Sequence, residues 1–159
     1  MTRLRVFESR CGTWSAPLNP VSTSTLCSGS AASQGAVFDS DVVIEILRGR
    51  VRVVEAAAAL EASGVPTFCT AISWAEIFAG IRSGEETHTL AFFEARGEVV
   101  LDRQVGHRAG GYLARFAKSH GVEIADALVA ATAAVSGLRL WTLNRNHYPM
   151  DDLRFFEES

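Results

Sequence analysis

Short apolar runs alternate along most of this chain with longer segments in which apolar residues recur at helical spacing. The short runs are rich in β-branched and aromatic residues and end at polar residues, as buried strands do. In the segments between them, apolar positions recur every three or four residues, which indicates amphipathic helices packed on a sheet. The predicted strands are residues 36–39, 66–70, 98–101 and 138–142, with 153–157 as a possible edge strand.

Helices are predicted between these strands, and glycines mark where several of them end. The first helix has Ser40 or Asp41 as its N-terminal cap, and Asp102 is expected to cap the fifth. Strands that alternate with helices predict an α/β protein whose parallel sheet is covered on both faces, with functional groups at the carboxyl ends of the strands. The predicted helices are residues 40–49, 51–64, 71–84, 85–97, 103–121 and 125–137.

The first 35 residues show neither the strand nor the helix period. They are rich in serine and threonine and contain a single acidic residue, Glu8, which predicts a flexible N-terminal extension. A wrongly assigned start codon would give the same pattern as a genuine disordered tail, and an organellar transit peptide is a weaker alternative. The ordered part is expected to be one domain, residues 36–159.

Composition and charge narrow the possible functions. The 159 residues are 48% hydrophobic, which is enough for one core, and no apolar stretch reaches the roughly 20 residues needed to cross a bilayer. Residues 1–35 hold three arginines and one glutamate, so the remainder has a formal charge of −5. Proteins that coat nucleic acid are usually basic. If this protein acts on nucleic acid, local arginines and a metal ion must supply the attraction.

The three cysteines do not form a close pair with the spacing of a metal site. Cys69 lies in an apolar run and is predicted to be a small buried thiol. An odd number of unpaired cysteines is typical of a reducing compartment, and a cytoplasmic location is therefore expected.

Three carboxylates occupy positions where structure alone does not require them. Asp39 ends the first predicted strand, Glu76 shares a helical face with apolar or small residues such as Ile72, and Asp126 opens the apolar stripe of a later helix. Burying an ionised carboxylate without compensation costs several kcal/mol. The structural alternatives are a favourable helix N-terminus for Asp126 and a salt bridge to Arg82 for Glu76.

These acids would repel one another in a single cleft unless a divalent cation lay between them. Mg²⁺ prefers oxygen ligands and keeps waters that a substrate phosphate can replace, so the sequence predicts a magnesium site. Asn144, shortly after the fourth strand, is a candidate for a further oxygen ligand or for orienting a water. A turn-forming asparagine is the alternative at that position.

Four segments together resemble the motifs of the PIN-domain ribonucleases, and specifically the VapC toxins of prokaryotic toxin-antitoxin pairs. The segments are "VFDSDVVIEILRG", "ISWAEIFAGIR", "IADALVAATA" and "TLNRNHYP", and the resemblance extends from residue 36 to about 156. It implies a three-layer α/β/α sandwich with a central parallel sheet, a homodimer, RNA as substrate and a cognate VapB-like antitoxin that covers the active site.

The resemblance also assigns the site residues. The first acid of the family falls on Asp39, the second on Glu76 and the third on Asp126, while Asn144 stands at the fourth position, which is often acidic in PIN domains. This departure removes one negative charge, so one tightly held Mg²⁺ is expected, with Mn²⁺ as a possible substitute. His147 stands where the family often has an aspartate or histidine before an aromatic residue.

The implied reaction is hydrolysis of an RNA phosphodiester by metal-activated water. Asp39 and Asp126 would hold the metal, with Glu76 as a further ligand or as the group that positions or deprotonates the water. Products with a 5′-phosphate and a 3′-hydroxyl are expected. Arg48, Arg82 and Arg145 are candidate substrate contacts, and Trp141 and Tyr148 are candidates for base stacking, although Trp141 lies in a strand and is expected in the core.

Two other functions compete with this interpretation. Asp39 and Asp41, separated by one residue after a strand, are also similar to the nucleophile and acid of haloacid dehalogenase-like phosphatases, but Val43 stands where those enzymes need threonine and Lys118 is the only lysine. A catalytically inactive PIN-like binding module is the other alternative, and Asn144 is its only support. In the nuclease interpretation, Asp41 caps the helix or borders the cleft.

Overall fold

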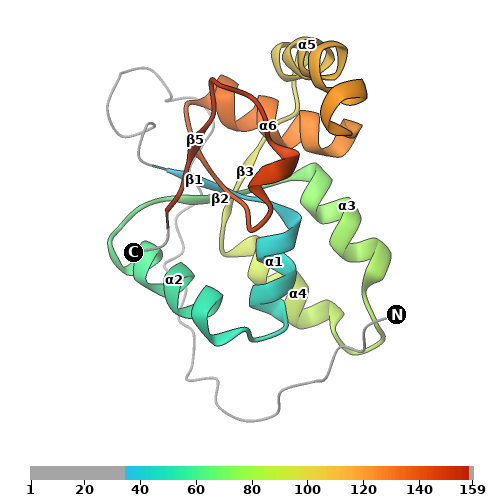
Figure 1. Ribbon diagram of the computed structural model, residues 1–159. Helices are drawn as coiled ribbons and strands as arrows, with labels where there is room; N and C mark the ends of the chain where they lie inside the picture. Colours follow the sequence, from blue (N-terminus) through green and yellow to red (C-terminus); the bar gives the residue numbers. More distant parts are fainter. Residues whose placement is uncertain (1–34, 158–159) are drawn as a thin grey trace.

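The computed structural model describes residues 35–157, which form one sheet covered by helices (Figure 1). All strand pairings are parallel, in the order β3-β2-β1-β4-β5, so β1 lies at the centre and the predicted edge strand β5 lies at one edge. The predicted extension lies outside the described residues, except for Gly35. The strands are β1 (Ala36–Phe38), β2 (Thr67–Thr70), β3 (Gly97–Val99), β4 (Arg139–Trp141) and β5 (Arg154–Phe155).

Side chains of the central strands alternate between two separate cores. Val37 and Leu140 face one core, which is closed by α5 and α6, whereas Phe38 and Trp141 face the other, which is closed by α1, α2 and α4 (Figure 1). The predicted three-layer α/β/α sandwich is therefore confirmed. The helices are α1 (Ser40–Leu47), α2 (Val51–Ala62), α3 (Ala71–Gly80), α4 (Glu86–Glu94), α5 (Arg103–His120) and α6 (Ile124–Ser136), and a 3-10 turn, η2 (Arg145–His147), precedes β5.

Helix α3 takes a different place from the other helices. It contacts both α1 and α6, so it lies across the edge of the sandwich and not flat on one face of the sheet (Figure 1). Its Ile77 is buried in the α1–α2–α4 core, while Ile72 packs against the core on the other face. Helix α3 thus brings its own residues to the side of the carboxyl ends of the strands.

Three helix boundaries differ from the prediction. Helix α4 ends at Glu94 and not at Gly97, because Gly97 already belongs to β3. The cap of α1 is Asp39, whose Oδ1 accepts a hydrogen bond from the Ser40 amide at 2.8 Å, and not Ser40 or Asp41. Helix α3 ends at Gly80 and not at Gly84, because Ile81 is extended, with φ −67° and ψ 146°. The side chain of Glu85 accepts a hydrogen bond from the Arg82 amide, so the loop is stabilised without a further helical turn.

Other boundaries agree with the prediction. Asp102 caps α5 by accepting hydrogen bonds from the amides of Gln104 and Val105, both at 2.9 Å.

Cys69 is buried in β2, as predicted, and burial raises the pKa of its thiol to about 12. Within residues 35–157, no helix combines the length and apolar character that a membrane span requires.

Candidate active site

The carboxyl ends of β1 and β4 meet at the centre of the sheet. Phe38 of β1 is paired with Trp141 of β4, and the Asp39 amide donates a hydrogen bond to the Trp141 carbonyl at 2.9 Å. Asp39 and Thr142, which directly follow these strands, therefore lie side by side. This is the place where parallel sheets commonly carry functional groups.

Asp39 is fixed from two sides. Besides capping α1 with Oδ1, it accepts a hydrogen bond from the Tyr148 hydroxyl on Oδ2 at 2.8 Å. Burial and the negative charge of Asp41 raise the pKa of Asp39 to about 6, although these hydrogen bonds counteract the increase. A positive charge beside Asp39 would relieve both causes.

Asp126 combines a structural contact with an available oxygen. It stands in the first turn of α6, where Oδ2 accepts a hydrogen bond from the Glu123 amide at 3.0 Å. Its Oδ1 faces Nδ1 of the exposed His147 at 3.7 Å. One oxygen of Asp126 thus has the structural role of a residue at a helix start, as in the alternative above, and the other oxygen lies beside His147.

Tyr148 joins the aspartates and has a different role from the predicted one. It is 4% exposed, with its hydroxyl directed at Asp39, so it is not available to stack on a base, and that prediction is wrong. Burial and the negative charges of Asp39, Asp126 and Asp41 raise the pKa of this phenol. The sequence placed Tyr148 in a loop, but its contact with Asp39 spans 109 positions and depends on the fold.

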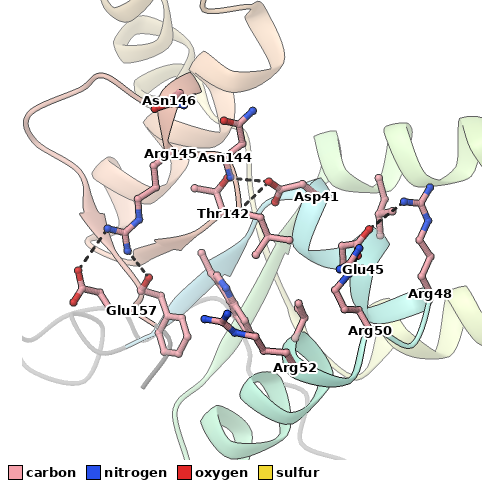
Figure 2. Close-up of a pocket in the computed structure, with 15 residues that line it drawn as sticks. Asp41, Glu45, Arg48, Arg50, Arg52, Thr142, Asn144, Arg145, Asn146 and Glu157 are labelled. Carbon is pink, nitrogen blue, oxygen red and sulfur yellow. Dashed lines mark hydrogen bonds and ion pairs between the residues drawn. The ribbon is translucent and has the colours of Figure 1, made fainter. Parts of the chain in front are cut away.

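Asp41 ties α1 to the loop that follows β4. Its Oδ2 accepts hydrogen bonds from the Thr142 hydroxyl at 3.2 Å and from the Leu143 amide at 3.0 Å (Figure 2). Its Oδ1 is buried without a hydrogen-bond partner. Asp41 also lines a surface groove beside the end of β1. Of its two predicted roles, the helix cap is wrong, because Asp39 caps α1, and the border of the active-site cleft stays a prediction.

Glu76 differs most from its predicted environment. It is exposed, because α3 packs through Ser73 and Ile77 and leaves the Glu76 face toward solvent. Within the described part of the chain it has no hydrogen-bond or ion-pair partner, so the alternative salt bridge to Arg82 is absent there. The expectation of a buried carboxylate was wrong, and a role for Glu76 must come from its access to solvent.

The loop after β4 carries the remaining candidates. Asn144 precedes η2, its amide donates to the Thr142 hydroxyl at 3.1 Å, and its exposed side chain borders the same groove as Asp41. Trp141 is 1% exposed and belongs to the core, as expected. Thr142, which binds both this loop and Asp41, was missed by sequence analysis, although its position at the end of a central strand is a usable signal.

The donor set fits a hard cation. The available groups are oxygens of carboxylates, a hydroxyl and an amide, and Asp41 Oδ1 lacks a partner. In the range 35–157, however, no three carboxylate, imidazole or thiol groups lie close enough to hold a metal by themselves, so the predicted close cluster of Asp39, Glu76 and Asp126 is not formed. An ion that takes one or two carboxylates and otherwise keeps its water, as Mg²⁺ does, suits this arrangement.

Comparisons with known proteins agree with this geometry. Residues 36–153 match the PIN domain. The chain is 34% identical to the ribonuclease VapC10 of Mycobacterium tuberculosis over 115 residues, covering 72% of this chain and 86% of VapC10. It is 33% identical to the ribonuclease VapC19 of the same species over 116 residues, covering 72% of this chain and 92% of VapC19.

Among solved structures, VapBC2 from Rickettsia felis, bound to a DNA fragment from its promoter, shares the fold. The TM-score is 0.64 with 16% identity, covering 76% of this chain and 96% of the other. A haloacid dehalogenase-like phosphatase is therefore excluded. The chain belongs to the PIN-domain family and, within it, to the VapC ribonucleases.

Proposed function

We propose that this chain is a magnesium-dependent endoribonuclease that acts as the toxin of a toxin-antitoxin pair. The observation that supports the assignment of its site is the position of Asp39, which follows β1 at the centre of the sheet and accepts a hydrogen bond from the buried hydroxyl of Tyr148. Asp39 and Asp126 are both fixed by hydrogen bonds from backbone amides, so they need no large rearrangement to bind a cation. Preorganisation of this kind is what metal-dependent hydrolysis requires.

Asp39 and Asp126 would hold Mg²⁺, with Mn²⁺ as a substitute. When bound, the ion supplies a Lewis acid that polarises a phosphoryl oxygen and lowers the pKa of water. Glu76, exposed and without a partner among the described residues, would accept a proton from the attacking water or complete the ligand set. Asn144 would orient that water or the substrate phosphate through its side-chain amide.

Water would attack the phosphorus in place of the ribose 2′-hydroxyl, and the P–O3′ bond would break, with the 3′-oxygen leaving and taking up a proton. The products would then carry a 5′-phosphate and a 3′-hydroxyl. The test is incubation of the purified chain with RNA and Mg²⁺, beside Asp39→Asn and with EDTA, followed by analysis of the product ends. Cleavage that survives both controls, or a 2′,3′-cyclic phosphate product, would contradict the proposal. Absence of cleavage by the unmodified chain would favour an inactive binding module.

The partners follow from the same assignment. Solved structures of the same fold are toxin-antitoxin complexes, which supports a homodimer silenced by a VapB-like antitoxin. Since the substrate is RNA, the cytoplasm is the expected place of action. Coexpression with an antitoxin followed by size-exclusion chromatography tests this, because a chain that remains monomeric and active in its presence would contradict it.

A further inference from the structure

A groove with a volume of about 990 Å³ lies between the junction of α1 and α2 and the loop after β4. Asp41, two residues after Asp39, and Asn144 border it, and Phe156 contributes to its lining. A nucleic-acid strand bound at the aspartates could continue into this groove. The inference below therefore rests on the proposed activity toward RNA.

One wall of the groove carries two arginines held by a single carboxylate. Glu45 accepts a hydrogen bond from Arg48 Nη1 on Oε1 at 3.1 Å and one from Arg50 Nε on Oε2 (Figure 2). The Glu45 side chain is only 16% exposed, whereas those of Arg48 and Arg50 are 39% and 66% exposed. Glu45 thus fixes two guanidinium groups at the surface.

Each of these guanidinium groups retains most of its hydrogen-bonding capacity. A guanidinium has five N–H donors, and Glu45 engages one from each arginine. Planar groups with several free donors match the oxygens of a phosphate, and fixing them in advance lowers the entropy lost on binding. The pair Arg48 and Arg50 is therefore better suited to phosphates than two mobile lysines would be.

The opposite wall has a similar arrangement. Arg145 donates a hydrogen bond to the Phe156 carbonyl at 3.1 Å and lies 3.5 Å from Glu157 (Figure 2). The groove lining holds four arginines and three carboxylates, so it is locally positive in a protein of net charge −3. Four of the lining residues are arginines, and this local excess of positive charge favours a polyanion as the ligand.

We propose that this groove is a second phosphate subsite, in which Arg48 and Arg50 bind backbone phosphates of the RNA strand whose scissile phosphate lies at Asp39 and Asp126. The contacts are to the backbone, so the subsite contributes affinity and register and does not read the base sequence. It would act equally on every RNA that the enzyme binds.

The test compares RNA binding by the full chain and by Arg48→Gln/Arg50→Gln in EDTA. The probe is a fluorescein-labelled single-stranded RNA of random sequence, about twelve nucleotides long, followed by anisotropy at several salt concentrations. The matched control is Arg103→Gln/Lys118→Gln, which removes the same net charge from the exposed surface of α5. Arg48→Lys/Arg50→Lys keeps the charge and reports on folding and on the need for guanidinium groups.

The proposal predicts that the Gln variant weakens binding about tenfold and reduces the slope of log Kd against log salt by about 1.4, that is about 0.7 for each lost phosphate contact. The control should bind as the unmodified chain does, and the Lys variant should fall between the two. Equal losses in the Gln variant and the control, or no loss in either, would overturn the subsite. So would unchanged RNA affinity together with lost capture of a coexpressed antitoxin, since the groove would then bind protein.

Cleavage assays with Mg²⁺ separate this inference from the proposed function. If the subsite acts in substrate binding, the Gln variant has a raised KM and a kcat close to that of the unmodified chain. If the unmodified chain and the Gln variant cleave RNA with the same KM, the phosphate subsite is contradicted and the nuclease proposal is not. A chain that binds the probe through these arginines without cleaving any RNA contradicts the nuclease proposal and leaves the phosphate subsite standing.

Discussion

Asp39 at the end of β1 and Asp126 at the start of α6 differ from Glu76 on α3 in how far their surroundings fix them. Asp39 and Asp126 are half-buried, and each accepts a hydrogen bond from a backbone amide. Glu76 is exposed and has no partner within residues 35–157. In the mechanism proposed above, the first pair would hold the cation in a fixed place, and the exposed Glu76 would act on water. The proposal thus separates positioning from proton transfer.

The strongest test of this contrast is removal of a fixed carboxylate. Asp126→Asn keeps the side-chain shape and an oxygen for the Glu123 amide, but removes the charge that would hold Mg²⁺. Loss of the several kcal/mol that a catalytic cation supplies corresponds to a rate decrease of about 1000-fold. The measurement is single-turnover RNA cleavage together with Mg²⁺ titration by calorimetry. Normal Mg²⁺ affinity in this variant would show that Asp126 is only a helix residue.

Glu76→Gln should have a smaller effect of a different kind. Loss of a general base typically lowers kcat by about 100-fold or more, and since Glu76 is not part of the fixed pair, Mg²⁺ affinity should change little. Steady-state kinetics and calorimetry on the same preparation separate the two effects. Glu94→Gln, an exposed residue of α4, is the matched control. If Glu76→Gln weakens Mg²⁺ binding as much as Asp126→Asn does, Glu76 is a metal ligand, and the proposed difference between it and the two fixed carboxylates is wrong.

The raised pKa of Asp39 should affect how the free energy of unfolding depends on pH. Its pKa is raised to about 6 in the folded protein from 3.8, so the folded state takes up more protons and the ionised form destabilises it above pH 6. Asp39→Asn, measured in EDTA, should increase the free energy of unfolding at pH 7.5 by about 2 kcal/mol, somewhat less than the shift alone implies because the helix cap is altered.

The difference in the free energy of unfolding between the unmodified chain and Asp39→Asn should disappear as the pH falls to 4, where Asp39 of the folded protein is protonated and uncharged. Urea unfolding at both pH values provides the measurement. Addition of Mg²⁺ should stabilise the unmodified chain and not the variant. A variant that is less stable at pH 7.5 would show that the hydrogen bonds of Asp39 outweigh the cost of its burial.

The sequence was sufficient to predict most of the fold, because its elements are encoded locally. Period and glycine positions placed all five strands and six helices, and the strand end at Asp39 followed from one apolar run. The end of α3 could not be predicted in this way. There the helix is terminated by an extended Ile81 and by side-chain contacts from Glu85 in the next segment, which hydrophobic periodicity does not report.

The site was predicted less completely, for a physical reason. Asp39 and Asp126 have positions that local pattern reveals, a strand end and a helix start. The exposure of Glu76 depends on how α3 crosses the edge of the sandwich. Helical periodicity shows which residues share a face, but it does not show which element that face packs against. The contact of Tyr148 with Asp39 likewise arises only when the loop after β4 folds back over β1.

That contact gives the finest test of the fixed pair. Tyr148→Phe keeps the buried ring and removes only the hydroxyl that donates to Asp39 Oδ2. Groups that orient a metal ligand typically contribute 10- to 100-fold to metal affinity, and here about tenfold weaker Mg²⁺ binding is expected, with kcat at saturating Mg²⁺ nearly unchanged. Calorimetry and cleavage at several Mg²⁺ concentrations provide the measurement. Tighter Mg²⁺ binding in the variant would mean that the hydroxyl competes with the cation for Asp39. The hydrogen bond from Tyr148 would then oppose metal binding and would not position the carboxylate for it.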